Sequence, residues 1–168
     1  MRNVAKILSF VGSIFFCAYM FVQVQLSLPV PVDFVQNPVE IEIQHSLVRL
    51  NAPSNKVEAL TDAVYTASAI TRIDPLLLVA LMYTESNFNL NAVSSLNYKG
   101  LMQTPYASMK WADVDVLIGA RILREKITIA RNDVPLAVAL YKGGNNTAAK
   151  KYASETLRLY RRLKSEAI

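Results

Sequence analysis

The sequence predicts an all-α domain that follows an apolar N-terminal segment and a proline-containing linker. Apolar residues recur three or four positions apart through most of the chain after residue 55. Residues that start and stop helices bound each of these stretches. Two-residue alternation of apolar and polar residues, as in a strand, occurs over one short run near residue 41. The 168 residues suffice for one modest domain with a core, which we expect over residues 55–168.

An apolar run covers residues 7–24 and follows Arg2 and Lys6. Its length lies between the apolar part of a secretion signal and a full membrane span of about 20 residues. We interpret residues 1–25 as a signal peptide or membrane anchor. The flanking positive charges favour a cytoplasmic N-terminus, and thus an exported domain in the periplasm. No small-x-small cleavage pattern ends the run, so we favour an uncleaved anchor in the inner membrane, with cleavage as the alternative.

Residues 26–54 form the expected linker, or arm. Four prolines lie in this stretch: Pro29, Pro31, Pro38 and Pro53. Prolines this frequent stop helices and predict an extended, loosely packed segment. The alternation around Ile41 and Ile43 is compatible with one strand.

The composition argues against a metal site or cofactor. His45 is the only histidine and Cys17 the only cysteine. A metal site built on imidazole or thiolate ligands is therefore not expected, and neither is a Ser-His or Cys-His catalytic dyad. The net charge is +5, and the C-terminal stretch is basic. No nucleic-acid motif accompanies this charge, and export argues against such a partner. Two interpretations of the basic C-terminal stretch remain. It faces the membrane or anionic wall polymers, or it is a solvated helical face with no special partner.

Helix signals place five helices in order. Asn55 and Glu58 have capping-box spacing and predict a first helix to about Thr71. Asp74 followed by Pro75 starts the second. The third is expected to be capped by Asp113 or Asp115, the fourth runs from Asp133-Pro135 to Gly143-Gly144, and the fifth covers about 146–163. Residues 87–112 are rich in turn formers and predict a loop.

The second helix ends in a glutamate that is a candidate acid catalyst. Residues 76–82 are apolar on every face, which predicts a buried helix. Glu85 lies seven residues after Leu78 and four after Leu81, so it shares their face. A carboxylic acid against apolar neighbours resists ionising and can remain a proton donor. A surface glutamate, or one paired with Lys or Arg, is the alternative.

Four blocks in order resemble the catalytic domain of soluble lytic transglycosylases, relatives of goose-type lysozyme. The first two are Glu85-Ser86 with Phe88, Ala92 and Ser94, and Gly100-Leu101-Met102-Gln103. The third is Ile118-Gly119-Ala120 with Leu123, and the fourth covers 137–144, an alanine-rich helix ending in a tyrosine and two glycines. The resemblance spans roughly residues 56 to 155 and implies a compact lysozyme-like fold.

The resemblance implies cleavage of the bond between N-acetylmuramic acid and N-acetylglucosamine in peptidoglycan. Glu85 would protonate the leaving oxygen and then, once ionised, take the proton of the sugar's own primary hydroxyl. An anhydro ring closes and no water is consumed, so this is a lyase reaction without a second carboxylate. Asp74, the nearest upstream acid, lies about 16 Å back along the helix, too far to cooperate.

The resemblance also suggests substrate-binding residues: Ser94, Gly100, Met102, Gln103 and Tyr141. Ser94 and Gln103 would line the groove and orient the glutamate or bind the sugar. Gly100 would let the loop pass close to Glu85. Met102 would belong to the groove, packing its floor, and the hydroxyl of Tyr141 would reach towards Glu85.

Three departures from the family pattern bear on activity. Asn97 stands at a usual glycine, which a left-handed backbone at Asn can accommodate. The segment after Gln103 is short, which could reshape part of the groove. Lys142 replaces the asparagine that normally follows the tyrosine. We expect Lys142 to point outwards, because an ammonium near Glu85 would favour its ionised form and weaken acid catalysis.

The sequence thus predicts an exported, membrane-tethered lytic transglycosylase whose partners are peptidoglycan glycan strands. A short single-domain form suits local wall opening by a secretion, conjugation or pilus machine, or by a phage. A hydrolytic muramidase is one alternative, favoured if Asp113 or Asp115 stands beside Glu85. A non-catalytic wall-binding or scaffold protein is the other, favoured if Lys142 is ion-paired to Glu85.

Overall fold

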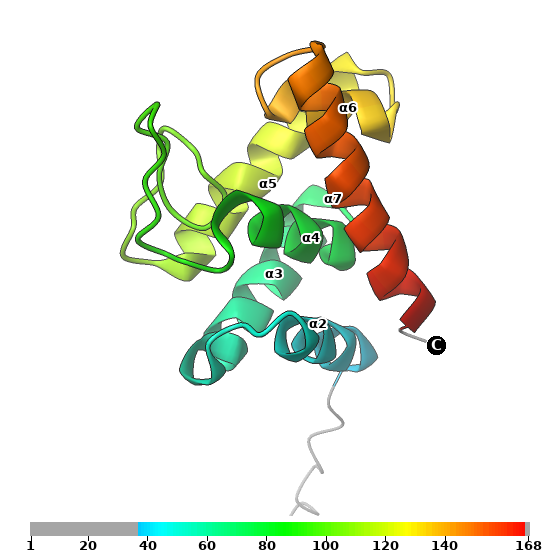
Figure 1. Cartoon of the computed structure of the whole chain (residues 1–168). Coiled ribbons are helices and arrows are strands. Elements are labelled where there is room, and N and C mark those ends of the chain that lie inside the picture. The colour runs from blue at the N-terminus through cyan, green and yellow to red at the C-terminus, as the bar shows by residue number, and fades with distance from the viewer. Residues whose placement is uncertain (1–36, 167–168) are drawn as a thin grey trace, which may run out of the picture. The chain divides into compact units, whose positions relative to one another are not determined.

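The computed structural model describes residues 37–166, and this part of the chain is all-α, as predicted. Figure 1 shows the arrangement of its helices. They are α2 (Pro38–Arg49), a 3-10 turn (Ser54–Lys56), α3 (Val57–Thr71), α4 (Pro75–Ser86), α5 (Ala112–Ile129), α6 (Val134–Tyr141) and α7 (Thr147–Glu166). The expected signal or anchor at residues 1–25 lies outside the described residues. Within them, every helix is too short or too polar to cross a membrane.

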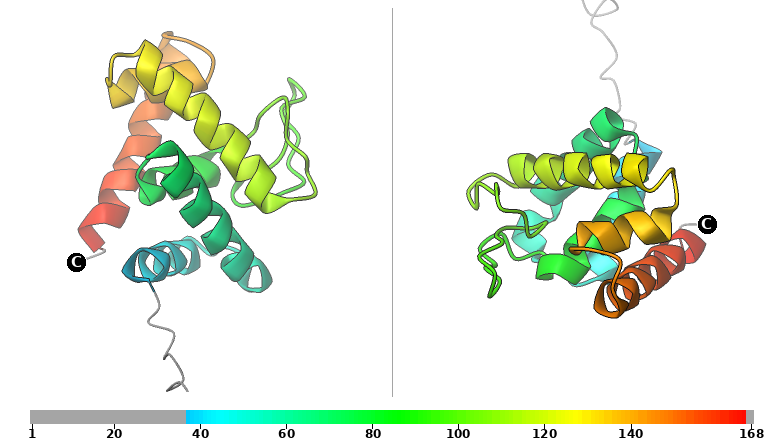
Figure 2. Two further views of the ribbon diagram at one scale, coloured as in Figure 1. Left: turned by 180° about the vertical axis from the view of Figure 1, so that it is seen from behind. Right: turned by 90° about the horizontal axis from the view of Figure 1, so that it is seen from above.

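Helix α4 lies at the centre of the fold and packs against α2, α3, α5 and α7, as the views in Figures 1 and 2 agree. It begins as the sequence predicts: Pro75 is its first residue, and the Asp74 carboxylate accepts a hydrogen bond from the Leu76 N–H at 2.9 Å. Residues 76–82 are all buried. A helix that is apolar all round can only be accommodated in this way, with neighbours on every side.

Helices α4 and α7 are also joined by polar contacts near the start of α4. The Tyr160 hydroxyl donates to Asp74 at 3.0 Å, and the Lys164 ammonium lies 3.2 Å from the same carboxylate. Asp74 therefore serves two purposes, because one oxygen caps α4 and the other binds α7.

The prediction of an extended arm with a strand is wrong for residues 38–49, which form α2. Pro38 occupies the first turn, where no backbone N–H is needed, and the Asn37 side chain caps the helix through the Val39 N–H. Ile43 and Leu47, four residues apart, are fully buried against the helical core. The four-residue spacing of Ile43 and Leu47 is the pattern that indicates a helix here, whereas the alternation around Ile41 does not correspond to a strand.

Two predicted helix caps are also wrong. Helix α3 begins after the 3-10 turn without any side-chain cap, so the Asn55–Glu58 capping box is not formed. Helix α5 begins at Ala112, which places Asp115 inside the helix, where it is fully buried. The last two helices begin where the sequence predicts, and both carry a side-chain cap: the Asp133 carboxylate accepts from the Leu136 N–H, and the Asn146 side chain accepts from the Ala149 N–H.

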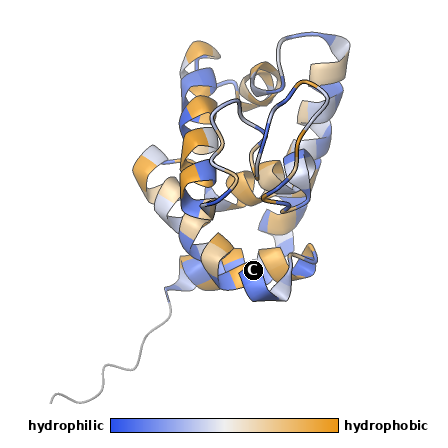
Figure 3. Ribbon diagram, turned by 90° about the vertical axis from the view of Figure 1, so that its left-hand side faces the viewer, coloured by the Kyte–Doolittle hydropathy of each residue, from blue (hydrophilic) through white to orange (hydrophobic). Residues whose placement is uncertain are grey.

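The predicted loop connects α4 to α5 over residues 87–111 and stands to one side of the helices in Figure 1. Two isolated antiparallel bridges, Val93 with Lys99 and Lys99 with Thr104, give it a hairpin-like core. Asn97 is left-handed, with φ 61°, as its replacement of glycine requires. Orange apolar and blue polar turns alternate along the helices behind this loop in Figure 3.

Candidate active site

Glu85 lies in the last turn of α4, and its side chain is only 3% exposed. Both of its carboxylate oxygens have partners from other helices. The Tyr152 hydroxyl of α7 donates to Oε1 at 2.7 Å, and the Lys142 ammonium at the end of α6 donates to Oε2 at 2.8 Å. Hydrogen bonds and ion pairs of this length to a buried carboxylate are the strong kind. The site is therefore built where α4, α6 and α7 meet.

The expectation that Lys142 points outwards is wrong. Lys142 is the residue at which α6 ends, and its flexible side chain reaches back over the end of α4 to Glu85. Its ammonium also lies 4.7 Å from the centre of the Tyr152 ring, a cation–π distance. In this arrangement Glu85 is paired with a counter-ion and has a partner on each of its two carboxyl oxygens.

Tyr152 was not among the residues that the sequence indicated. Its hydroxyl also lies 3.2 Å from the Thr84 hydroxyl, which is 3.1 Å from that of Thr156. Burial raises the pKa of Tyr152 far above its ordinary value, and the charge of Glu85 raises it further. Tyr152 thus stays protonated and remains a donor to Glu85. Its four-residue spacing from Thr156 on the inner face of α7 is a sequence signal that could have identified it.

Tyr141 lies near Glu85 but its hydroxyl bonds elsewhere. It donates to the backbone carbonyl of Met102 at 2.7 Å. Burial raises the pKa of Tyr141 well above its ordinary value, and the charge of Glu85 is the second cause. The resemblance implied that this hydroxyl reaches Glu85, whereas the structure gives that contact to Tyr152.

The loop segment at residues 101–102 is fixed from two sides. Ser86, the residue after Glu85, donates through its hydroxyl to the Leu101 carbonyl at 2.8 Å. Tyr141 holds the next carbonyl, that of Met102. The Met102 side chain is 1% exposed and packs on Gly119, where an added Cβ would come within 2.4 Å of it. Met102 therefore forms the floor beneath the loop.

Gln103 and Ser94 make their hydrogen bonds within the loop. The Gln103 amide donates to the carbonyls of Ala92 and Gly100, at 3.1 and 3.0 Å. The Ser94 hydroxyl accepts from the Tyr98 N–H at 3.0 Å. In the described chain, then, both side chains hold the shape of the loop beside Glu85.

The reason for glycine at position 100 differs from the one expected. Gly100 has φ 75°, and an added Cβ would lie 2.2 Å from the Asp115 carboxylate and 2.8 Å from the Ala107 Cβ. The close approach is thus to Asp115 on α5 and not to Glu85. Asp115 also accepts a hydrogen bond from the Ser108 N–H. It serves to anchor the loop to α5, so it is not a second carboxylate beside Glu85.

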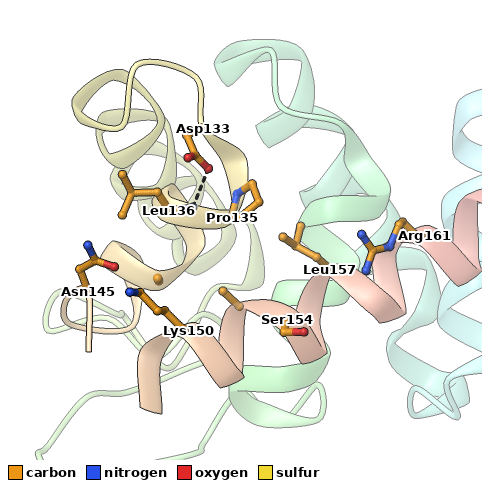
Figure 4. A pocket seen from close by; sticks show the side chains of 10 residues that line it. Asp133, Pro135, Leu136, Asn145, Lys150, Ser154, Leu157 and Arg161 are labelled. Atoms are coloured by element: carbon orange, nitrogen blue, oxygen red, sulfur yellow. Dashed lines mark hydrogen bonds between the residues drawn. The ribbon is translucent and has the colours of Figure 1, made fainter. Parts of the chain in front are cut away.

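A separate cavity of about 480 Å³ lies between α6 and α7. Figure 4 shows its polar rim, which includes Asp133, Lys150 and Arg161, around an apolar wall that contains Leu157. Neither Glu85 nor any of the predicted substrate-binding residues lines it.

Taken together, the described residues form an all-helical domain with one glutamate at the end of a buried helix, beside a loop fixed to that helix. Residues 62–161 match the family model of the transglycosylase SLT domain, and the chain belongs to this family. Its function is therefore of the lytic transglycosylase type, directed at peptidoglycan. None of the curated proteins matches the chain. Within residues 37–166, acids and histidine are nowhere grouped in threes that could hold a metal ion.

Proposed function

We propose that this protein is a peptidoglycan lytic transglycosylase that cleaves the bond between N-acetylmuramic acid and N-acetylglucosamine and leaves anhydromuramic ends. Glu85 is its acid and base. The observation that carries the proposal is the Glu85 carboxylate, 3% exposed at the end of α4 and bound by Tyr152, inside the region that matches the family.

In the first step the protonated Glu85 donates its proton to the leaving glycosidic oxygen, and positive charge develops on the sugar ring. The ionised Glu85 then accepts the proton of the sugar's own primary hydroxyl, whose oxygen closes the anhydro ring. Atoms and charges balance without water. Tyr152 remains neutral throughout, so its hydroxyl can hold Glu85 in place and stabilise the carboxylate between the two steps.

Lys142 must leave Glu85 before the first step, because Lys142 and Tyr152 together occupy both carboxyl oxygens and leave neither free to face the glycosidic oxygen. Two features make this movement feasible. The Lys142 side chain is 43% exposed, so its ammonium can be hydrated once released. The next residue, Gly143, has φ 114° and open space around the position of a Cβ. The ion-paired arrangement is then a resting state of the enzyme.

A non-catalytic wall-binding protein is the second candidate, and the Lys142–Glu85 pair favours it. If the pair never opens, the site keeps its shape but lacks a proton donor. Hydrolysis by a muramidase is less well supported, since Asp115 is fully buried against the loop and binds the Ser108 N–H, while Asp113 lines a groove along α3.

The proposal includes export and tethering. Residues 7–24 would hold the domain at the periplasmic face of the inner membrane, where peptidoglycan is within reach. The basic α7 supports a position near anionic lipids or wall polymers. Local opening of the wall for a secretion, conjugation or pilus machine, or for a phage, fits a domain of this size.

The test is mass spectrometry of fragments released from purified peptidoglycan by the full-length protein in detergent, beside a Glu85→Gln variant. Anhydromuramic ends formed by the unaltered protein alone would support the proposal. Reducing ends would indicate a muramidase. A folded protein that sediments with peptidoglycan but releases nothing would favour the wall-binding candidate.

A further inference from the structure

A groove of about 570 Å³ lies between α3 and the segment that leads from the loop into α5. Its walls are mainly apolar and include Leu60, Ala63 and Leu101. Four charged side chains also line it, two of each sign: Lys56, Lys110, Asp62 and Asp113. The groove is thus apolar within and balanced in charge.

Trp111 stands at this groove with 57% of its surface exposed. It is the only tryptophan in the chain. The Lys110 ammonium lies 4.9 Å from its ring centre. An exposed large aromatic ring beside an apolar hollow, with polar groups around it, is characteristic of a ligand site.

The backbone that carries Trp111 is held firmly by its neighbours. The Ser108 hydroxyl accepts hydrogen bonds from the N–H groups of Lys110 and Trp111, at 3.1 and 2.9 Å. The Ser108 N–H in turn donates to the buried carboxylate of Asp115. The turn is therefore ordered before any ligand arrives, which reduces the entropy cost of binding.

The groove is distinct from the site around Glu85, which is not among its lining residues. Leu101 connects the two regions. Leu101 is one of the residues that line the groove, and its backbone carbonyl accepts the hydrogen bond from Ser86, the residue next to Glu85. A ligand in the groove would contact the far side of the loop segment that flanks the reactive carboxyl.

We propose that this groove binds a second stretch of peptidoglycan glycan, away from the bond that is cut; the substrate class rests on the proposed function. The apolar C–H face of a pyranose ring can stack on Trp111, as flat apolar surfaces do on aromatic rings. Sugar hydroxyls can donate to Asp62 and Asp113, and acetamido carbonyls can accept from Lys56 or Lys110. The balanced charge favours the uncharged glycan over the acidic stem peptides.

The test uses Trp111 as its own reporter. The full-length Glu85→Gln protein in detergent is titrated with an N-acetylglucosamine hexamer while tryptophan emission is followed, with excitation outside the tyrosine band. We expect a saturable shift in emission. In parallel, Trp111→Ala should weaken sedimentation with purified peptidoglycan by about fivefold, the effect of losing one stacked aromatic contact. Trp111→Phe should retain most of the binding.

Tyr106→Ala is the matched control, because Tyr106 is an exposed aromatic residue of the same loop outside the groove. It should leave both measurements unchanged. Unaltered emission together with unaltered sedimentation of Trp111→Ala would overturn the inference. A shift in emission caused by a free stem peptide but not by the hexamer would also overturn it. Both readouts use the Glu85→Gln background, so they stand whether or not Glu85 proves to be catalytic.

Discussion

The Lys142 ammonium lies 2.8 Å from the Glu85 carboxylate, although the two residues are 57 positions apart in the chain. This contact puts a positive charge on the group that must act first as a proton donor. It also leaves the carboxylate with no free oxygen among its described surroundings, since Tyr152 binds the other one. The pair is the point at which catalytic and non-catalytic interpretations of this site diverge.

If the pair is a resting state, Lys142→Met should raise the rate of peptidoglycan cleavage. The Lys142 ammonium occupies Oε2 of the Glu85 carboxylate, and without it that oxygen is free to face the glycosidic bond. The rate at which fragments are released from purified peptidoglycan, measured at one fixed pH, checks this.

Lys151→Met is the control for the Lys142 variant, because it removes the same charge from an exposed position on α7. It should leave the cleavage rate as it was. A Lys142→Met protein that cleaves peptidoglycan more slowly than the unaltered one would contradict the resting-state interpretation and assign Lys142 a supporting role in the reaction.

Tyr152→Phe should lower the cleavage rate while the fold persists. The variant loses the hydrogen bond to Glu85 Oε1 and the contact with Thr84, whose hydroxyl keeps Thr156 as a partner. The loss of one such bond corresponds to about 1 kcal/mol. Kinetics on soluble glycan fragments, with circular dichroism as a check on folding, measure it. Tyr65→Phe, which loses a bond to Asn37 elsewhere, should keep its rate; an equal loss in both variants would argue against a positioning role for Tyr152.

The raised pKa of Tyr160 predicts that the domain loses stability at alkaline pH. Burial first, and then the hydrogen bond to Asp74, raise its pKa from 10.0 to about 12. The folded state thus holds this proton more tightly than the unfolded state. Its contribution to the free energy of unfolding is complete below about pH 10 and is lost as the pH rises through about 12.

Urea unfolding at the two ends of that window, with Tyr160→Phe alongside, tests this expectation. The variant should be less stable than the unaltered protein below the window, and the difference between them should shrink above it, because phenylalanine has no proton to lose. A constant difference across the window would contradict the assignment.

Gly100→Ala should destabilise the domain by about 2 kcal/mol or more, through both backbone strain and overpacking. An added Cβ would lie 2.2 Å from Asp115, which is buried and cannot retreat. Gly143→Ala is the matched comparison, because its φ of 114° is at least as restrictive for a residue with a Cβ, whereas its surroundings are open. Thermal unfolding should show the larger loss for Gly100→Ala; equal losses would mean that strain alone accounts for the effect.

Local patterns were enough to predict five of the helices and the burial of α4. Asp74 and Pro75 begin α4, and its apolar residues leave Glu85 at the end of a buried helix, all within one short stretch of sequence. Helix α2 was missed because the prolines in and around it, together with its brief alternation of apolar and polar residues, resemble an extended arm. The four-residue spacing of Ile43 and Leu47 is too short a pattern to predict a helix by itself. The two side chains are buried only because other helices pack against them.

The partners of Glu85 could not be predicted in the same way. Lys142 and Tyr152 reach it from α6 and α7, and their contacts depend on how those helices pack against α4. The role of Gly100 was assigned to the wrong neighbour for the same reason, since Asp115 approaches it from α5. Sequence spacing reports on one element at a time, whereas a site shared by several helices depends on their packing.

The contacts that Asp74 makes with Tyr160 and Lys164 have a consequence for how the site can open. Together with the hydrogen bond from Tyr152 to Glu85, these contacts hold α7 to both the first and the last turn of α4. Spreading these two helices would break all three contacts at once. We therefore expect a glycan strand to reach Glu85 from the side formed by the end of α6. Movement there requires displacement of the Lys142 side chain, and the backbone can change direction at Gly143.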